Sequence, residues 1–535
     1  MKRIHLIILT TAVLFTAGSC KKWLDINTDP SNPQVATAEM LLPPIQWQIS
    51  ATTANDYRFL FKTVQNWCSP NADNNWEAHG YEPTLDNGGA IWRMLYITSG
   101  PNLELLIKEA RENEKWTFAG IGYALKAYGF QLATDLHGPI ILDQAFDTTR
   151  LFFNYQDQPD VYARVREWID SSITCFSRTD RLNYSSALAS ADIIYKGDRE
   201  KWKKFAYAVL AQQYSHFVKK ANFASQYADS VIKYVDLSFS GAQEDATILA
   251  GNTSSGDANV FSPNAATSLV NITAANAVQA YTGRISQPII SMLTGGVRGT
   301  PTPNPTTSTD PRLRRMIPAD TLDGVYKGIV PTMGDATAGK RVPLIWGYML
   351  KGATNYVGKY LYYPASRYPI LSYSQLQFAK AEALFIKNES GLAHDAYKNG
   401  INGHMQFVNL YGSPVDPKIT QPEIDAYMSS TEVAQDGGEL KLSDIMTQKY
   451  IAQWGLAGME TFCDLRNYDY DTAIFKNLYF YQPEDLYGTN LGQKCYRYRP
   501  RYNSEYVWNK TELAKWKGTD PNYNTLPTWS MTPDQ

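Results

Sequence analysis

A loop near the start of the chain combines aromatic, amide and acidic side chains between two helical patterns. The side chains with suitable chemistry are Trp67, Asn71, Asp73, Asn74, Trp76 and Tyr81. Aromatic rings offer a flat apolar face with a polar edge, while amides and carboxylates form hydrogen bonds with hydroxyl groups. Because a sugar presents an apolar ring face and pairs of hydroxyls, this set predicts a carbohydrate-binding loop.

The exposure of the three aromatic rings decides whether this loop can bind a ligand. Trp67 and Tyr81 are more often found packed under such a loop, and we expect each of them to belong to the core. Trp76 lies between Asn75 and Glu77. These polar neighbours indicate that Trp76 is the most exposed of the three.

A second candidate group adjoins the irregular middle of the chain and consists of Tyr281, Arg284 and Trp346. The guanidinium of Arg284 can present two parallel donors to vicinal hydroxyls or to a carboxylate. The alternative is that Arg284 holds a loop carbonyl, which is the commoner role of arginine in a loop. Trp92 and Tyr96 have helical spacing and are expected in the core.

The sequence contains no motif of a catalytic centre. It lacks the HExxH, GxSxG, Walker and GxGxxG patterns. The neighbours Glu484 and Asp485 would point apart on a helix, whereas the acids of a glycosidase must flank one bond, and Asp464 and Arg466 are expected to form a structural pair. We therefore predict a binding protein without catalytic residues or cofactor. A hydrolase built from acids distant in sequence stays a minor alternative.

Metal binding is not expected either. The cysteines beyond residue 20 are too far apart for a metal knuckle and are Cys68, Cys175, Cys463 and Cys495. An exported chain could oxidise them, but a protein of this size forms a core without disulfides. Buried free thiols are therefore the preferred prediction.

The beginning of the chain has the layout of an export signal. Residues 1–19 combine a basic start, an apolar run of about 12 residues and small residues before Cys20. A membrane-spanning helix needs roughly 17 to 25 apolar residues. Cys20 at the cleavage point predicts lipidation of its thiol, with residues 20–34 as the tether. The alternative is an ordinary secretory signal with an incidental cysteine.

Composition and charge are those of a folded globular protein. Hydrophobic residues make up 44% and charged residues 19% of the chain, and the formal net charge is -2. No basic excess is present to attract nucleic acid. The length allows one large or two closely packed domains, and we expect a single domain over residues 35–535.

Helical patterns dominate after residue 90. Apolar residues recur at three- and four-residue steps in the ranges 91–114, 116–136, 161–176, 200–221 and 225–235. The clearest helical hairpin spans 372–411, with Gly391 expected to end its first helix. This hairpin resembles one unit of a tetratricopeptide-type repeat. Asp198 is expected to cap the helix that begins near Arg199.

Two long segments break the helical pattern. Residues 238–276 are rich in Ser, Gly, Asn and Ala, and residues 295–311 in Gly, Thr and Pro. Irregular segments of this length are usually functional or mobile. With the aromatic tail 496–529, they predict an irregular, ligand-facing part of the molecule.

Short motifs occur in a fixed order from the signal to residue 506: WLDINTDP at 23–30, TDLHGPI at 134–140, DIIYKGD at 192–198, KWKKFA at 201–206, DPRL at 310–313, QFAKAEA at 377–383, QKYIA at 448–452 and RPRYNSEY at 499–506. Each motif is weak alone, but their order is specific. The chain resembles the SusD/RagB family of nutrient-binding outer-membrane lipoproteins. It departs from the family at His137, where an aromatic residue such as Tyr or Trp is common.

The resemblance implies a mainly α-helical, SusD-like fold of four tetratricopeptide-like hairpins packed against an irregular, loop-rich, ligand-facing half. It also implies a lipid-anchored protein on the outside of the outer membrane. There it would capture oligosaccharides and deliver them to a SusC-like TonB-dependent transporter. The alternatives are a peptide ligand, a helical scaffold that binds only proteins, and an anchored glycoside hydrolase.

Overall fold

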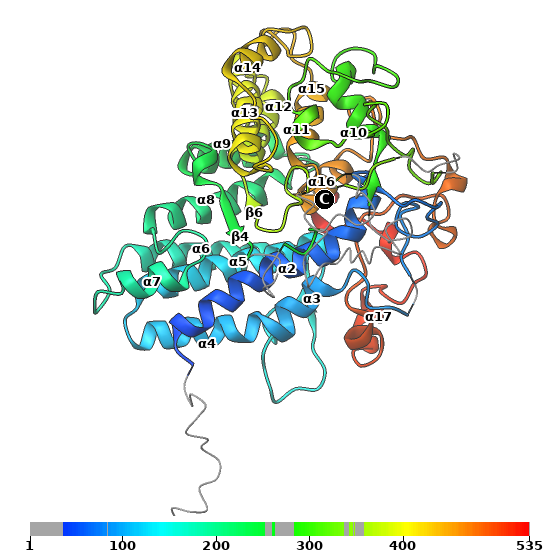
Figure 1. The fold of residues 1–535 in the computed structure, drawn as a ribbon. Coiled ribbons are helices and arrows are strands. Elements are labelled where there is room, and N and C mark those ends of the chain that lie inside the picture. Colours follow the sequence, from blue (N-terminus) through cyan, green and yellow to red (C-terminus); the bar gives the residue numbers. More distant parts are fainter. Residues whose placement is uncertain are drawn as a thin grey trace, which may run out of the picture.

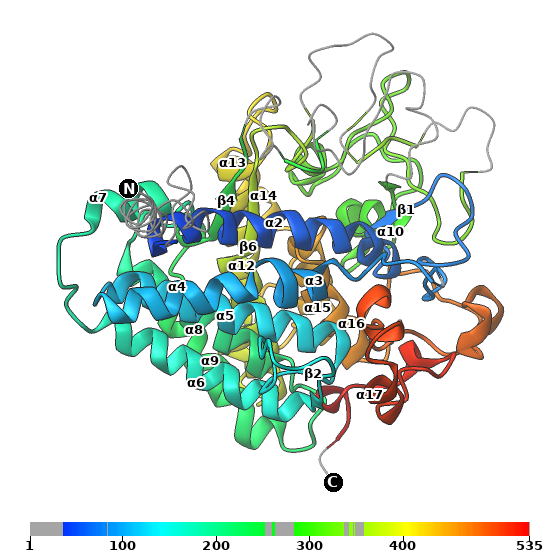
Figure 2. The ribbon, with the colours of Figure 1, turned by 90° about the horizontal axis from the view of Figure 1, so that it is seen from below.

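The computed structural model describes residues 36–82, 84–251, 259–262, 283–335, 342–345, 347 and 358–533. Cys20, Tyr281 and Trp346 therefore lie outside the described residues. Helices occupy one side of the molecule, and irregular segments gather on the other side in both views (Figures 1 and 2). The predicted mainly α-helical fold with a loop-rich half is confirmed.

Four pairs of helices that follow one another in the chain form the helical half. They are α4 (Gly100–Glu112) with α5 (Trp116–His137), α8 (Arg199–Ser215) with α9 (Ala228–Leu237), α12 (Tyr373–Ile386) with α13 (Ser390–Tyr411), and α15 (Leu442–Gln453) with α16 (Gly458–Asn467). Helix α6 (Gln158–Phe176) packs against both α5 and α8, and α12 packs against both α9 and α15. These contacts join the pairs into one continuous array.

Local sequence signals explain where several helices begin and end. Asp198 accepts hydrogen bonds from the amides of Glu200 and Lys201, and so caps α8 as predicted. Ser372 and Gln375 form a reciprocal capping box at the start of α12. The expected stop at Gly391 is wrong, because Asn388 takes the left-handed conformation with φ 63° and Gly391 lies inside α13.

The predicted helix 91–114 is interrupted. It consists of α3 (Ala90–Arg93), a π-helical turn (Met94–Thr98) and α4, which begins at Gly100. A Cβ atom at Gly100 would lie 1.9 Å from the carbonyl oxygen of Leu95, so the close approach at this break requires glycine. The predicted helix 200–221 ends early, at Ser215, and 225–235 begins as a π-helical turn (Phe223–Tyr227) before α9.

Helix α2 (Ala38–Thr63) has 26 residues and runs along α3 and α4 (Figure 2). Pro43 and Pro44 lie inside it, although proline removes an amide donor from a helix interior. Buried side chains such as Leu42, Ile49 and Phe61 hold this helix against the core. Packing therefore stabilises a helix that its sequence pattern does not predict.

Short elements complete the described chain. The strands pair in antiparallel fashion as β1 (Trp67–Cys68) with β5 (Arg284–Ile285), β2 (Ile140–Ile141) with β3 (Tyr155–Gln156), and β4 (Ala246–Leu249) with β6 (Arg367–Leu371). The short helices are α7 (Ser185–Ala191), α10 (Gln287–Ser291), α11 (Leu313–Met316), α14 (Gln421–Met428) and α17 (Lys510–Lys515). Strand β4 and a 3-10 turn (Ala242–Glu244) lie in residues 238–251, so this described part of the segment 238–276 is less irregular than predicted.

A buried ionic cluster fixes the DPRL motif before α11. Arg312 and Asp310 are both fully buried, and the Arg312 side chain donates to Asp310 from Nε at 2.9 Å and from Nη2 at 2.6 Å. Arg312 also donates to Gln448 Oε1 at 2.7 Å, and its Nη1 lies 3.2 Å from His404 Nδ1. The motif thus joins a loop to α13 and α15.

Cys68, Cys175, Cys463 and Cys495 are buried free thiols, as predicted. None of the helices in the described ranges is both long and apolar enough to cross a membrane.

Candidate ligand-binding site

Trp67, the first residue of the predicted loop, belongs to the core. Strand β1 pairs Trp67 with Ile285, and the fully buried indole lies 4.7 Å from the ring of Phe61 and 5.2 Å from that of Phe261. This burial agrees with the expectation for Trp67. Arg284, in the facing strand β5, is also buried. Neither side chain presents an open surface to a ligand.

Trp76 contradicts the predicted exposure. Its side chain is only 3% exposed and stacks on Tyr498, with ring centroids 5.6 Å apart and planes 10° from parallel. The ring of Phe59 lies 4.7 Å away on α2. Tyr498 comes from the C-terminal part of the chain, so the polar neighbours of Trp76 could not indicate that its ring would be covered.

Asp73 organises the loop around itself. Its carboxylate accepts hydrogen bonds from the amides of Asn75 and Trp76 at 2.8 and 3.0 Å, from Ser69 Oγ at 3.1 Å and from Lys62 Nζ at 3.2 Å. The Asp73 carboxylate is therefore occupied by protein donors. Two further predicted residues, Asn71 and Asn74, are exposed on this loop, and their contact with a ligand stays a prediction.

Glu77 is a structural residue that the sequence analysis missed. It is fully buried and accepts hydrogen bonds from the amides of Ser69 at 2.5 Å and Thr332 at 2.7 Å. These bonds join the loop to segment 328–335. Burial raises the pKa of Glu77 to about 7, and the two amide donors oppose that increase.

We expect a pH dependence from this carboxyl group. Between its unfolded pKa near 4.5 and its folded pKa of about 7, only the folded state binds the proton, so lowering the pH stabilises the folded state. From pH 8 to pH 5, the wild type should gain about 3 kcal/mol of unfolding free energy relative to Glu77→Gln. Denaturant unfolding of both proteins measures this difference, and parallel pH curves would contradict the assignment.

Arg499 organises a second aromatic group, which lies on the surface. Its guanidinium carbon lies 4.5 Å from the ring centroid of Tyr81, 5.4 Å from that of Tyr502 and 5.8 Å from that of Tyr506. The rings of Tyr502 and Tyr506 stack at 5.4 Å. Arg499 Nη2 also donates to the carbonyl oxygens of Glu82 and Leu85, at 2.5 Å each. One buried arginine thus holds three rings and a loop in place.

The adjoining residues add an exposed ring and polar groups. Trp508 follows the Tyr502–Tyr506 turn and is 72% exposed. Arg501 forms a 2.7 Å ion pair with Asp86, whose carboxylate also accepts from the amide of Asn503. We call Tyr81, Tyr502, Tyr506 and Trp508 the aromatic platform. It combines ring faces with amide and charged groups, as carbohydrate recognition requires.

The sequence analysis identified only part of this platform. Tyr81 was a candidate residue and is partly buried, as its position under Arg499 explains. The tail 496–529 was expected to face a ligand, but none of its residues was selected. The RPRYNSEY motif at 499–506, followed closely by Trp508, contains a usable signal because it places two arginines and two tyrosines within eight residues.

Two acidic side chains that the sequence analysis considered, Asp464 and Asp485, accept hydrogen bonds from other protein groups. Asp485 accepts from Tyr479 Oη and from the amide of Gln482. The expected Asp464–Arg466 pair is wrong, because Asp464 accepts from Lys449 Nζ at 2.6 Å and Arg466 donates to the carbonyl oxygens of Tyr496 and Asp135. Within the described ranges, no cluster of three or more His, Cys, Asp or Glu side chains is arranged to hold a metal ion.

Comparisons with known proteins agree with this architecture. Residues 30–477 match the SusD-like family, described as starch-binding and associating with the outer membrane. No curated protein matches the chain. A SusD/RagB family protein from Bacteroides thetaiotaomicron has a similar structure, with TM-score 0.65, 18% identity and coverage of 94% of this chain and 100% of that chain.

A chitin-binding SusD homologue from Flavobacterium johnsoniae is also similar, with TM-score 0.64, 17% identity and coverage of 92% of this chain and 98% of that chain. At these identities, the structural likeness establishes the fold. The family match covers most of the sequence, including the hairpins and the loop around Trp76. The chain therefore belongs to the SusD-like family.

Proposed function

We propose that this protein is a cell-surface, nutrient-binding lipoprotein that captures oligosaccharides and delivers them to a SusC-like TonB-dependent transporter. The observation that carries the proposal is the aromatic platform on the loop-rich half of a SusD-like chain. The exposed Trp508 provides a face for a sugar ring, while the partly buried Tyr502 and Tyr506 stack on each other. The outer-membrane association in the family description supports the proposed location.

We favour a glycan over a peptide as the ligand. Asp86, Arg501 and Asn503 adjoin the Tyr502–Tyr506 turn and are joined by an ion pair and a hydrogen bond, so they form a polar surface next to it. Sugar hydroxyls both donate and accept hydrogen bonds. The chitin-binding description of a similar structure supports the same ligand class. A peptide ligand is the second candidate.

Incubation of the purified mature protein with a panel of soluble oligosaccharides tests the proposal. We expect retention of at least one glycan in affinity electrophoresis or calorimetry, without release of shorter products. Product release would instead indicate a hydrolase. Retention of peptides alone would favour the peptide alternative, and retention of neither class beside a co-purifying transporter would favour a protein-binding scaffold.

Truncation of the exposed ring gives a sharper test. Trp508→Ala should weaken binding of the retained oligosaccharide by about 2- to 12-fold, because it removes one stacking contact of about 0.5 to 1.5 kcal/mol. The melting temperature should stay nearly unchanged, since the ring is exposed. Phe480→Ala, which truncates an exposed ring outside the platform, is the control. Equal loss of affinity in both variants would refute a specific role for Trp508.

A further inference from the structure

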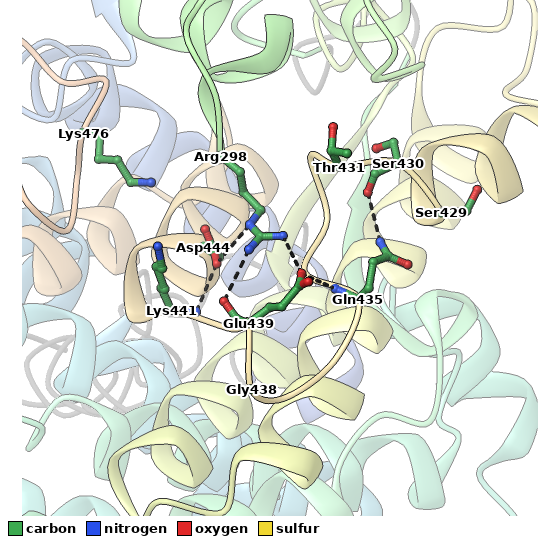
Figure 3. A pocket seen from close by; sticks show the side chains of 10 residues that line it. All are labelled: Arg298, Ser429, Ser430, Thr431, Gln435, Gly438, Glu439, Lys441, Asp444 and Lys476. Atoms are coloured by element: carbon green, nitrogen blue, oxygen red, sulfur yellow. Dashed lines mark hydrogen bonds and ion pairs between the residues drawn. The ribbon is translucent and has the colours of Figure 1, made fainter.

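A polar cavity separate from the aromatic platform lies beside the beginning of α15. Its volume is 570 Å³. It is lined by Arg298, Ser429, Ser430, Thr431, Gln435, Gly438, Glu439, Lys441, Asp444 and Lys476 (Figure 3). These residues come from the segment after α10, the connection between α14 and α15, the first turn of α15, and the segment after α16. The cavity is large enough for a small polar molecule.

Arg298 builds one wall of this cavity. Its guanidinium donates to Glu439 Oε2 at 3.1 Å and to the carbonyl oxygen of Val433 at 3.4 Å, and its Nε lies 3.5 Å from Asp444 Oδ2. These contacts hold the connection between α14 and α15 against the segment after α10. The Arg298 side chain is therefore occupied by protein partners.

Asp444 offers the cavity an unused acceptor. Its side chain is 1% exposed, and Oδ2 accepts from the amide of Lys441 at 3.0 Å. The second oxygen, Oδ1, is buried without a hydrogen-bond partner in the protein. A buried acceptor without a donor costs free energy, so a donor from a bound molecule would be stabilised here.

The remaining walls supply both donors and acceptors. Ser429, Ser430 and Thr431 contribute hydroxyl groups, while Lys441 and Lys476 are exposed cations at the opposite side (Figure 3). An anion would meet the carboxylates of Asp444 and Glu439, and a cation would meet the lysines. A neutral molecule with several hydroxyls can donate to Asp444 and accept from lysine at the same time.

We propose that this cavity binds a neutral sugar residue through its hydroxyl groups. It is a second saccharide site, distinct from the aromatic platform in position and in chemistry, because polar groups rather than ring faces provide recognition. This inference rests on the proposed function. With a second site, the protein could hold one oligosaccharide at two points or bind a second saccharide molecule.

The test uses the methyl glycosides of glucose, galactose and N-acetylglucosamine with the full mature chain. Saturation-transfer NMR titrations compare the wild type with Asp444→Asn, Lys476→Met and Lys108→Met. Lys108 is exposed on α4, away from the cavity. We expect about tenfold weaker binding in Asp444→Asn and about threefold in Lys476→Met, because a charge-assisted hydrogen bond is lost in each. Lys108→Met should bind like the wild type.

The outcomes separate this inference from the proposed function. Lys476 is exposed, so its variant keeps the test valid if Asp444→Asn does not fold. Equal binding of the glycosides by all four proteins, or no binding by the wild type, overturns the cavity assignment. Oligosaccharide binding that is weakened in Trp508→Ala, with methyl glycosides that bind all four proteins equally or none of them, would support the proposed function while refuting the second site.

Discussion

Replacing Arg312 by methionine is expected to destabilise the protein by about 3 to 5 kcal/mol. Arg312 and Asp310 have no solvent exposure, and three hydrogen bonds join their side chains. Methionine replaces the apolar stem of the side chain but not the guanidinium, so the Asp310 carboxylate would stay buried without its cation. Gln448 and His404 would lose a donor as well.

Two further variants test whether the unpaired, buried carboxylate of Asp310 causes the loss of stability. Arg314→Met removes an ion pair with Glu423 that lies at the surface, and should cost no more than about 1 kcal/mol. The double variant Asp310→Asn/Arg312→Met should recover part of the lost stability because it removes the buried charge. Urea unfolding of the four proteins measures these effects. An Arg312→Met protein as stable as Arg314→Met would contradict this account.

The buried Arg312 cluster also determines the protonation state of His404. Burial, together with the nearby Arg312, lowers the pKa of His404 well below its ordinary value. The imidazole is therefore neutral, and its Nδ1 accepts from Arg312 Nη1. This tautomer leaves the proton on Nε2, which faces Tyr360 Oη at 3.4 Å.

Helices with local signals at their ends could be predicted from the sequence. The cap at Asp198 and the apolar spacing of the hairpin 372–411 predict α8, α12 and α13 because those signals act within a few residues. Helix α2 contains two prolines, which disfavour a helix interior, so its stability depends on tertiary packing. The local sequence pattern therefore does not predict this helix.

The candidate site could be predicted as a region but not residue by residue. Trp76 has polar neighbours in sequence, yet Tyr498 covers its ring in the folded chain. Tyr81 lies beside Tyr502 and Tyr506 only because Arg499 contacts all three rings. In each case the deciding contact joins the loop to the C-terminal tail. Composition predicts which segments form the irregular part of the molecule, while long-range packing determines which rings remain exposed.

Removal of the proposed lipid attachment should change where the protein is found. Each buried methylene of an acyl chain contributes about 0.8 kcal/mol to membrane binding, and two acyl chains make attachment stable. Cys20→Ser, expressed behind an ordinary secretory signal so that export continues, lacks the thiol that carries the lipid. We expect at least a tenfold loss from the membrane fraction after a carbonate wash, with the protein recovered in the soluble fraction, as about 1.4 kcal/mol already gives tenfold.

Lys22→Ser is the matched control, because it alters the same segment and keeps Cys20. The control should stay in the membrane fraction, and mass spectrometry of its mature form should find Cys20 as the first residue carrying a diacylglycerol group. Repeating the fractionation in cells without the partner transporter separates lipid attachment from attachment through a protein. If Cys20→Ser remains in the washed membranes of those cells, an anchor other than the lipidated cysteine holds the chain, and the interpretation of residues 1–20 is wrong.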